Sequence, residues 1–121
     1  MPKILIVDDV ATEQQYLSEV VTRLGHTYAI ANDGQEALAL ARSEQPNLIL
    51  LDVVLPKLDG FQVCRKIKND PQTAHIPVIL VSSKSQESDE YWGLKQGADG
   101  YVRKPFTPDD LTSVITRHLA A

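Results

Sequence analysis

Five residues that could do chemistry together follow short apolar runs of the chain. Asp52 ends the run LILL, and Asp8 and Asp9 follow ILIV. Ser82 follows PVILV, and Lys104 follows GYVR. An ionised carboxylate beside buried apolar residues is costly to desolvate, so Asp52 is expected to be paired, metal-bound or neutralised.

This set of side chains indicates phosphoryl transfer to a carboxylate. Clustered carboxylates raise each other's pKa values unless a cation joins them, and their hard oxygen ligands suit Mg²⁺. The metal and Lys104 would neutralise the transferring group, and Ser82 would bond one of its oxygens. Asp52 would then be the nucleophile that forms an acyl phosphate. Taken singly, each residue has a plainer interpretation as a helix cap, a turn hydroxyl or a surface charge.

The elements that must position these residues alternate along the chain. Strands are expected at 4–7, 27–31, 48–51, 77–81 and 100–102. Helix starts are predicted at Thr12, Asp33, Asp59 and Thr107, a further helix at about 86–96, and helix ends at Gly25 and Gly97. Apolar strands separated by helices imply a parallel sheet covered on both faces, so the fold class is α/β, a doubly wound (βα)5 domain. Ligands of such sheets bind beyond the carboxyl ends of the strands, where the five reactive residues fall.

Composition limits the classes of function. The chain has 121 residues, enough for one domain, and its 16 acidic and 12 basic residues give a net charge of −4. That balance argues against a nucleic-acid face. Cys64 is the single cysteine, which excludes a disulfide framework and favours a small core residue. No segment reads as a signal peptide or as a span of about 20 apolar residues, so a cytoplasmic location with no membrane partner is expected.

The motifs ILIVDD, LILLDVVLPKLDG, PVILVSS and GADGYVRKPF resemble the receiver domains of two-component response regulators, in particular single-domain chemotaxis-type ones. The resemblance covers essentially the whole chain. It implies a flavodoxin-like receiver fold with strand order 2-1-3-4-5 over residues 1–121, without an output domain. It also implies a phosphoacceptor switch rather than an enzyme. A histidine kinase or histidine phosphotransfer domain would be the donor, and a downstream protein would bind the face made by helix four, strand five and helix five.

The resemblance assigns a metal site by position. Asp52 matches the phosphoacceptor, Asp9 the direct Mg²⁺ ligand, and Asp8 the acid that reaches the metal through water. The backbone carbonyl of Val54 would be a further protein ligand.

The resemblance also assigns a switch. Ser82 matches the switch hydroxyl, Tyr101 the aromatic whose rotamer follows phosphorylation, and Lys104 the lysine that contacts the phosphoryl group. The peptide bond between Lys104 and Pro105 is expected to be cis.

Three positions suggest properties of this particular chain. Val54 and Lys84 border the path of the water that hydrolyses the acyl phosphate in receivers, so an apolar Val54 and a basic Lys84 predict a longer-lived phosphate than in the fastest motility regulators. The segment SSKSQESDEYWGLKQGA resembles regulators of type IV pilus (twitching) motility. Within it, Trp92 is either a partly buried packing residue or an anchor for a partner.

Two other classes of function compete with the switch. A flavodoxin-like cofactor protein needs a hydroxyl- and glycine-rich loop after the first strand, but DDVATE is acidic and lacks glycine. A phosphate-independent pseudo-receiver usually loses an acid or the lysine, whereas this chain retains all of them. Mg²⁺ binding would separate the pseudo-receiver from the switch.

Overall fold

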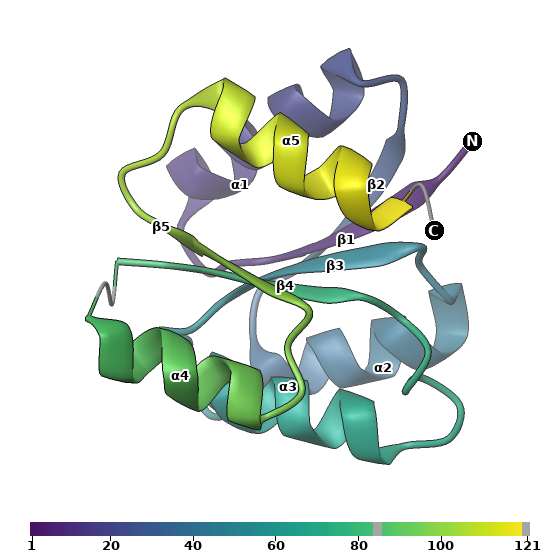
Figure 1. Cartoon of the computed structure of the whole chain (residues 1–121). Helices are drawn as coiled ribbons and strands as arrows, with labels where there is room; N and C mark the ends of the chain where they lie inside the picture. The colour runs from purple at the N-terminus through teal and green to yellow at the C-terminus, as the bar shows by residue number, and fades with distance from the viewer. Residues whose placement is uncertain (84–85, 120–121) are drawn as a thin grey trace.

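Five parallel strands form one sheet in the order β2-β1-β3-β4-β5 (Figure 1). The computed structural model describes residues 1–83 and 86–119. The strands are β1 (Lys3–Val7), β2 (Thr27–Ala31), β3 (Leu48–Asp52), β4 (Val78–Ser82) and β5 (Gly100–Arg103). This arrangement confirms the predicted fold class and strand order.

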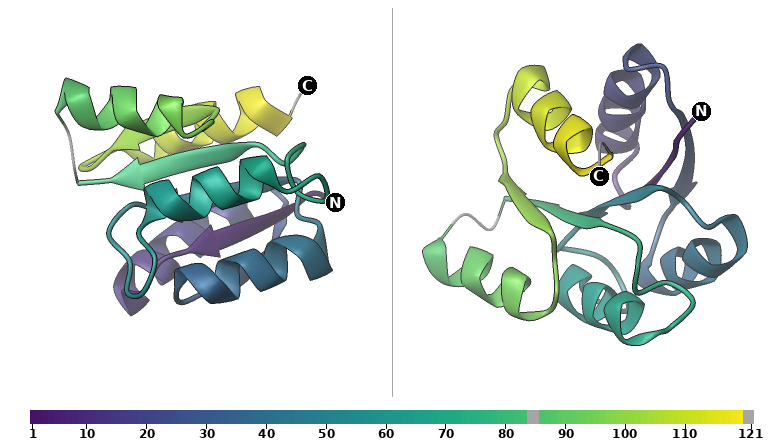
Figure 2. Two further views of the ribbon diagram at one scale, coloured as in Figure 1. Left: turned by 90° about the horizontal axis from the view of Figure 1, so that it is seen from below. Right: turned by 45° about the vertical axis from the view of Figure 1, so that its right-hand side comes forward.

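Five helices cover both faces of the sheet. They are α1 (Ala11–Arg23), α2 (Gly34–Glu44), α3 (Gly60–Asn69), α4 (Glu87–Lys95) and α5 (Pro108–Leu119). Helices α1 and α5 lie on one face, and α2, α3 and α4 lie on the other (Figures 1 and 2). Lys84, for which the sequence predicts a role beside the phosphate, lies outside the described residues.

The core consists of two layers, one on each side of the sheet. Alternate residues of a strand point to opposite faces, so Leu5 and Val7 pack beneath α2 and α3 while Ile4 and Ile6 pack beneath α1 and α5. All of β3 and β4 is buried. A strand buried on both faces needs a continuous apolar run, which is the pattern that the sequence carries.

Most predicted helix ends are confirmed. The Asp33 carboxylate accepts a hydrogen bond from the Glu36 backbone N–H at 2.8 Å, and Asp59 forms a reciprocal capping box with Gln62. Thr107 caps α5 through the backbone N–H of Asp110. The chain leaves α1 at Gly25 and leaves α4 at Gly97, both with positive φ.

The predicted N-cap at Thr12 is wrong, because α1 begins earlier. Val10 occupies the N-cap position in an extended conformation, and its carbonyl accepts from the Gln14 N–H at 3.0 Å. Val10 has no capping side chain of its own, but its N–H donates to Asp8 Oδ1 at 2.9 Å. The acid of the strand end therefore organises the entry to the helix.

Cys64 is the small core residue that the sequence predicts. Cys64 is completely buried, and burial raises the pKa of its thiol to about 12, so it behaves as a core residue. Among the described residues, none of the helices has the length and apolar character needed to span a bilayer.

Gly60 holds the loop after β3 against the end of that strand. Its N–H donates to the Val53 carbonyl at 2.7 Å. A Cβ at this position would lie 2.6 Å from the Val53 Cα and 2.9 Å from the Asp52 carbonyl carbon, both rigid backbone atoms. The close approach therefore requires glycine and fixes the backbone that carries Asp52.

We expect Gly60→Ala to lower the free energy of unfolding by about 3 kcal/mol, because the new methyl group forces strand and loop apart. Urea unfolding followed by circular dichroism measures this loss. The control is Ser43→Ala at an exposed position of α2, which should change stability by less than about 0.5 kcal/mol. Equal stability of the two variants would contradict the close approach.

Candidate functional site

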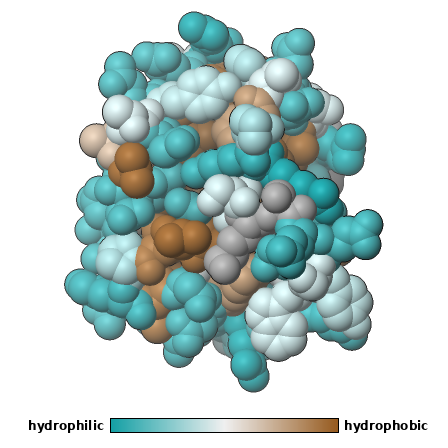
Figure 3. Space-filling view, turned by 90° about the vertical axis from the view of Figure 1, so that its left-hand side faces the viewer, coloured by the Kyte–Doolittle hydropathy of each residue, from teal (hydrophilic) through white to brown (hydrophobic). Residues whose placement is uncertain are grey.

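Three aspartates converge at the carboxyl edge of the sheet, the side that Figure 3 faces. Carboxylate oxygens of Asp8, Asp9 and Asp52 lie within 4.8 Å of one another. Asp52 is the last residue of β3, and Asp8 directly follows β1, its neighbour in the sheet. Asp8 is 1% exposed and Asp52 is 8% exposed, whereas Asp9 is open to solvent. The structure thus brings together the three acids that the sequence singled out.

Backbone N–H groups satisfy only part of the hydrogen-bonding capacity of these carboxylates. Asp52 Oδ1 accepts from the Val54 N–H at 3.2 Å, and Asp8 Oδ1 accepts from the Val10 N–H. The second oxygen of Asp8, Oδ2, is buried and has no hydrogen-bond partner among residues 1–83 and 86–119. A buried carboxylate oxygen without a partner is costly, so a ligand with positive charge or donors suits this position.

Of the cations that the structure describes, Lys104 lies nearest to the cluster. Its Nζ lies 3.7 Å from Asp8 Oδ2 and 3.8 Å from Asp52 Oδ2. Both contacts are longer than hydrogen bonds, so the ammonium is shared between the acids rather than bound closely to either. The peptide bond between Lys104 and Pro105 is cis, as expected.

Glu13 is a further acid of the site that sequence reasoning missed. It lies in the first turn of α1, and its Oε2 is 3.8 Å from the same Lys104 Nζ. A Glu side chain four residues after Asp9, on a helix that starts at Ala11, can reach back over the edge of the sheet. That spacing was visible in the sequence, but it points to Lys104 only when the fold places the segment after β5 beside the start of α1.

Burial shifts the acids toward their protonated forms. Desolvation raises the pKa of Asp52 to about 6, although Lys104 opposes the shift. Desolvation also raises the pKa of Asp8, against the Val10 hydrogen bond and Lys104. Burial is the main cause of both shifts, and a cation bound beside these acids would lower both pKa values.

The acid cluster fits Mg²⁺ on these observations. Asp8, Asp9 and Asp52 offer hard oxygen donors, one of them unsatisfied, and the exposed Asp9 leaves an open side for water and phosphate.

Ser82 and Tyr101 connect the site to the outer strand. Ser82 ends β4, and its side chain is fully buried. It hydrogen-bonds to the phenol of Tyr101 on the adjacent β5, and burial raises the pKa of that phenol. The two residues that the sequence paired as a switch are therefore in contact.

Val54 and Trp92 are two exposed apolar residues of the predicted set. Val54 is 55% exposed beside Asp52, and Trp92 is 53% exposed on α4.

Comparisons with known proteins agree on one family. Residues 4–116 match the family described as response regulator receiver domain. Protein PilH of Pseudomonas aeruginosa is 43% identical over 120 residues, which are 99% of this chain and 99% of PilH. Several other curated relatives are longer, and this chain spans less than half of their length.

Solved structures match over nearly the whole chain. Chemotaxis protein CheY4 of Vibrio cholerae has a TM-score of 0.91 at 30% identity, covering 98% of this chain and 99% of that chain. The receiver domain of sensor histidine kinase PA1611 from P. aeruginosa has a TM-score of 0.92 at 27% identity, covering 99% and 98%. The PA1611 structure holds a magnesium ion in its active-site cleft.

The raised pKa of Asp52 predicts a stability penalty at neutral pH in the presence of EDTA. The folded chain binds the Asp52 proton more tightly than the unfolded chain does. The free energy of unfolding therefore gains from the protonated carboxyl below about pH 4, and this gain is lost as pH rises through about 6. We expect Asp52→Asn to be more stable than the wild type by about 2–3 kcal/mol at pH 7.5. This gain should disappear near pH 4, and urea unfolding at both pH values measures it.

Glu19→Gln is the control for a lost carboxylate, because Glu19 is exposed on α1. Its effect should stay within about 0.5 kcal/mol and should not depend on pH. A gain for Asp52→Asn that is equal at pH 4 and pH 7.5 would show that burial does not shift this carboxylate.

Proposed function

The chain belongs to the response regulator receiver family, and we propose that it is a phosphorylation-dependent signalling switch with Asp52 as the phosphoacceptor. The observation that carries the proposal is the position of Asp52. Its carboxylate ends a buried strand, lies 3.8 Å from Lys104 and belongs to a cluster of three acids. Receiver domains act as phosphoacceptor switches, and a core carboxylate with no such role would be costly.

We propose that Asp8, Asp9, Asp52 and the Val54 backbone carbonyl hold Mg²⁺ in this chain. The unsatisfied Asp8 oxygen and the magnesium ion of the related PA1611 structure support this assignment. When bound, the ion would supply charge neutralisation for the transferring phosphoryl group.

The transfer itself would be carried by Asp52 and Lys104. A carboxylate oxygen of Asp52 attacks the phosphorus of a phosphohistidine, the new O–P bond forms, and the P–N bond breaks. The imidazole leaves with the electron pair of that bond and takes up a proton. Lys104, which is shared between Asp8 and Asp52 before transfer, can turn to the phosphoryl oxygens and stabilise their charge. The donor would be a histidine kinase or a histidine phosphotransfer domain.

We propose that Ser82 and Tyr101 transmit phosphorylation of Asp52 to the surface of the molecule. The Ser82 hydroxyl would turn from Tyr101 to a phosphoryl oxygen, and Tyr101 would then move inward. Their present hydrogen bond and their places on adjacent strands support this coupling. Phosphorylation would shift an equilibrium between two packings rather than create a new fold.

The proposed output is a contact with a downstream protein on the face made by α4, β5 and α5. Three of the exposed large apolar residues lie on α4, namely Tyr91, Trp92 and Leu94, each at least 50% exposed. An exposed tryptophan is a common anchor in protein interfaces, so Trp92 is proposed to contact the partner.

The biological setting is proposed from similarity. The 43% identity to PilH supports a place in the type IV pilus chemosensory group, with control of motility from the cytoplasm. We also propose that the acyl phosphate is long-lived, because Val54 is an exposed apolar neighbour of Asp52 that cannot orient a hydrolytic water.

Incubation with acetyl phosphate tests the switch directly. With Mg²⁺, we expect the wild-type chain to gain one phosphoryl group by intact mass, because Asp52 then has both charge-neutralising cations. Asp52→Asn should gain none, and EDTA should abolish the gain for the wild type. Asp109→Asn, an exposed acid of α5, serves as the matched control and should be labelled normally. Mg²⁺ binding without labelling by acetyl phosphate or by phosphoramidate, or labelling at another residue, would contradict the proposal.

Glu13 should restrain the reaction by competing for Lys104. We expect Glu13→Gln to speed labelling by acetyl phosphate about 1.5- to 5-fold, the range that corresponds to losing a partly exposed ion pair. Glu19→Gln on the same helix should leave the rate unchanged. Slower labelling of Glu13→Gln would mean that Glu13 orients Lys104 rather than competing for it.

A further inference from the structure

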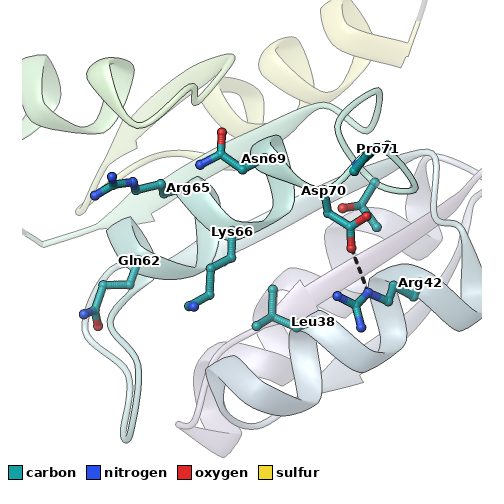
Figure 4. A pocket seen from close by; sticks show the side chains of 9 residues that line it. Leu38, Arg42, Gln62, Arg65, Lys66, Asn69, Asp70 and Pro71 are labelled. Carbon is teal, nitrogen blue, oxygen red and sulfur yellow. Dashed lines mark hydrogen bonds and ion pairs between the residues drawn. The ribbon is translucent and has the colours of Figure 1, made fainter.

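A groove between α2 and α3 lies outside the acidic site (Figure 4). It encloses about 780 Å³. Its lining comes from both helices and from the turn after α3: Leu38, Arg42, Gln62, Arg65, Lys66, Asn69, Asp70, Pro71 and Thr73. Figure 4 shows Lys66 extending from α3 toward Leu38 of α2.

The charge of this groove is positive and incompletely compensated. Its one acid, Asp70, accepts from Arg42 Nε at 2.8 Å and from the Gln72 N–H at 2.9 Å. Arg65 and Lys66 are exposed neighbours in sequence, and no carboxylate of the described residues lies within ion-pair distance of either. Six other cations of the described residues do have a carboxylate partner. Two adjacent unpaired cations in an acidic chain favour an anionic ligand.

Arg42 is held where it can contribute to the same charge. Its ion pair with Asp70 uses only Nε, so the other guanidinium donors remain available. Gln62 is also fixed, because its Oε1 accepts from the Asp59 N–H in the capping box at 3.2 Å. Among the described residues the amide NH₂ of Gln62 has no acceptor, so it can donate to a ligand oxygen.

We propose that this groove binds an acidic segment of a partner protein, with carboxylates on Arg65, Lys66 and Arg42. Such binding depends on none of the groups that act at Asp52. The groove is lined by the amides Gln62 and Asn69 beside its cations, which suit a peptide with mixed polar groups. A long polyanion such as a nucleic acid would meet the repulsion of a chain with a net charge of −4.

Titration with hexaglutamate, followed by ¹H–¹⁵N NMR, tests the proposal. We expect shifts confined to α2, α3 and the turn at 70–73, with affinity that falls as salt is raised. The double variant Arg65→Glu/Lys66→Glu should bind at least tenfold more weakly. Arg23→Glu/Arg117→Glu changes the net charge equally at two exposed positions on α1 and α5, and should change affinity less than twofold.

Three results would overturn the proposal. The first is equal binding by the two double variants, which would mean a response to net charge alone. The second is tighter binding of a ten-residue oligothymidylate than of hexaglutamate, which would assign the groove to nucleic acid. The third is self-association that only Arg65→Glu/Lys66→Glu abolishes, without hexaglutamate binding, which would make a second copy the occupant. Acetyl phosphate labelling of each variant reports separately on Asp52, so failure here leaves the switch untouched.

Discussion

Among the residues that the structure describes, the buried acids at the carboxyl edge of the sheet outnumber the cations, and the site depends on this imbalance. Parallel strands end at the same edge, so the acids after β1 and at the end of β3 cannot avoid one another. One ammonium, that of Lys104, lies within 3.8 Å of three carboxylates and forms no short bond with any. Desolvation at this edge raises the pKa of Asp52 to about 6, and Asp8 Oδ2 has no hydrogen-bond partner within residues 1–83 and 86–119.

The surrounding backbone prevents the acids from moving apart. Gly60 lets the loop after Asp52 pack closely against the end of β3, and Asp59, directly before Gly60, caps the start of α3. On the other side, the Asp8 carboxylate bonds to Val10 and directs the entry to α1. With both loops fixed, the acids cannot separate, so a bound cation relieves the repulsion between them. An acyl phosphate at Asp52 would add negative charge, which Lys104 and that cation would have to neutralise.

The sequence predicted the fold and the site where local signals and strand ends decide them. Strand apolarity indicated the sheet, and Asp33, Asp59 and Thr107 act as caps because each carries its own acceptor. The N-cap was misplaced at Thr12 because the group that bonds Val10 is Asp8, which lies outside the helix. Glu13 was missed for a related reason, since its partner Lys104 is brought near only by the packing of β5. A contact between segments far apart in the chain does not affect the spacing of residues within one segment, so that spacing cannot predict it.

The uneven distribution of charge also explains why the two surfaces are separable. The acids of the site are clustered at the sheet edge, whereas Arg65 and Lys66 lie on the outer surface of α3, in the α2–α3 groove. The proposed signal leaves through Ser82 and Tyr101, on β4 and β5, toward α4 and α5. The ion pair of the α2–α3 groove at Asp70 involves neither switch residue. A partner bound in this groove would not respond to phosphorylation of Asp52. Such a partner would hold the chain at a site in the cell in both its phosphorylated and unphosphorylated forms.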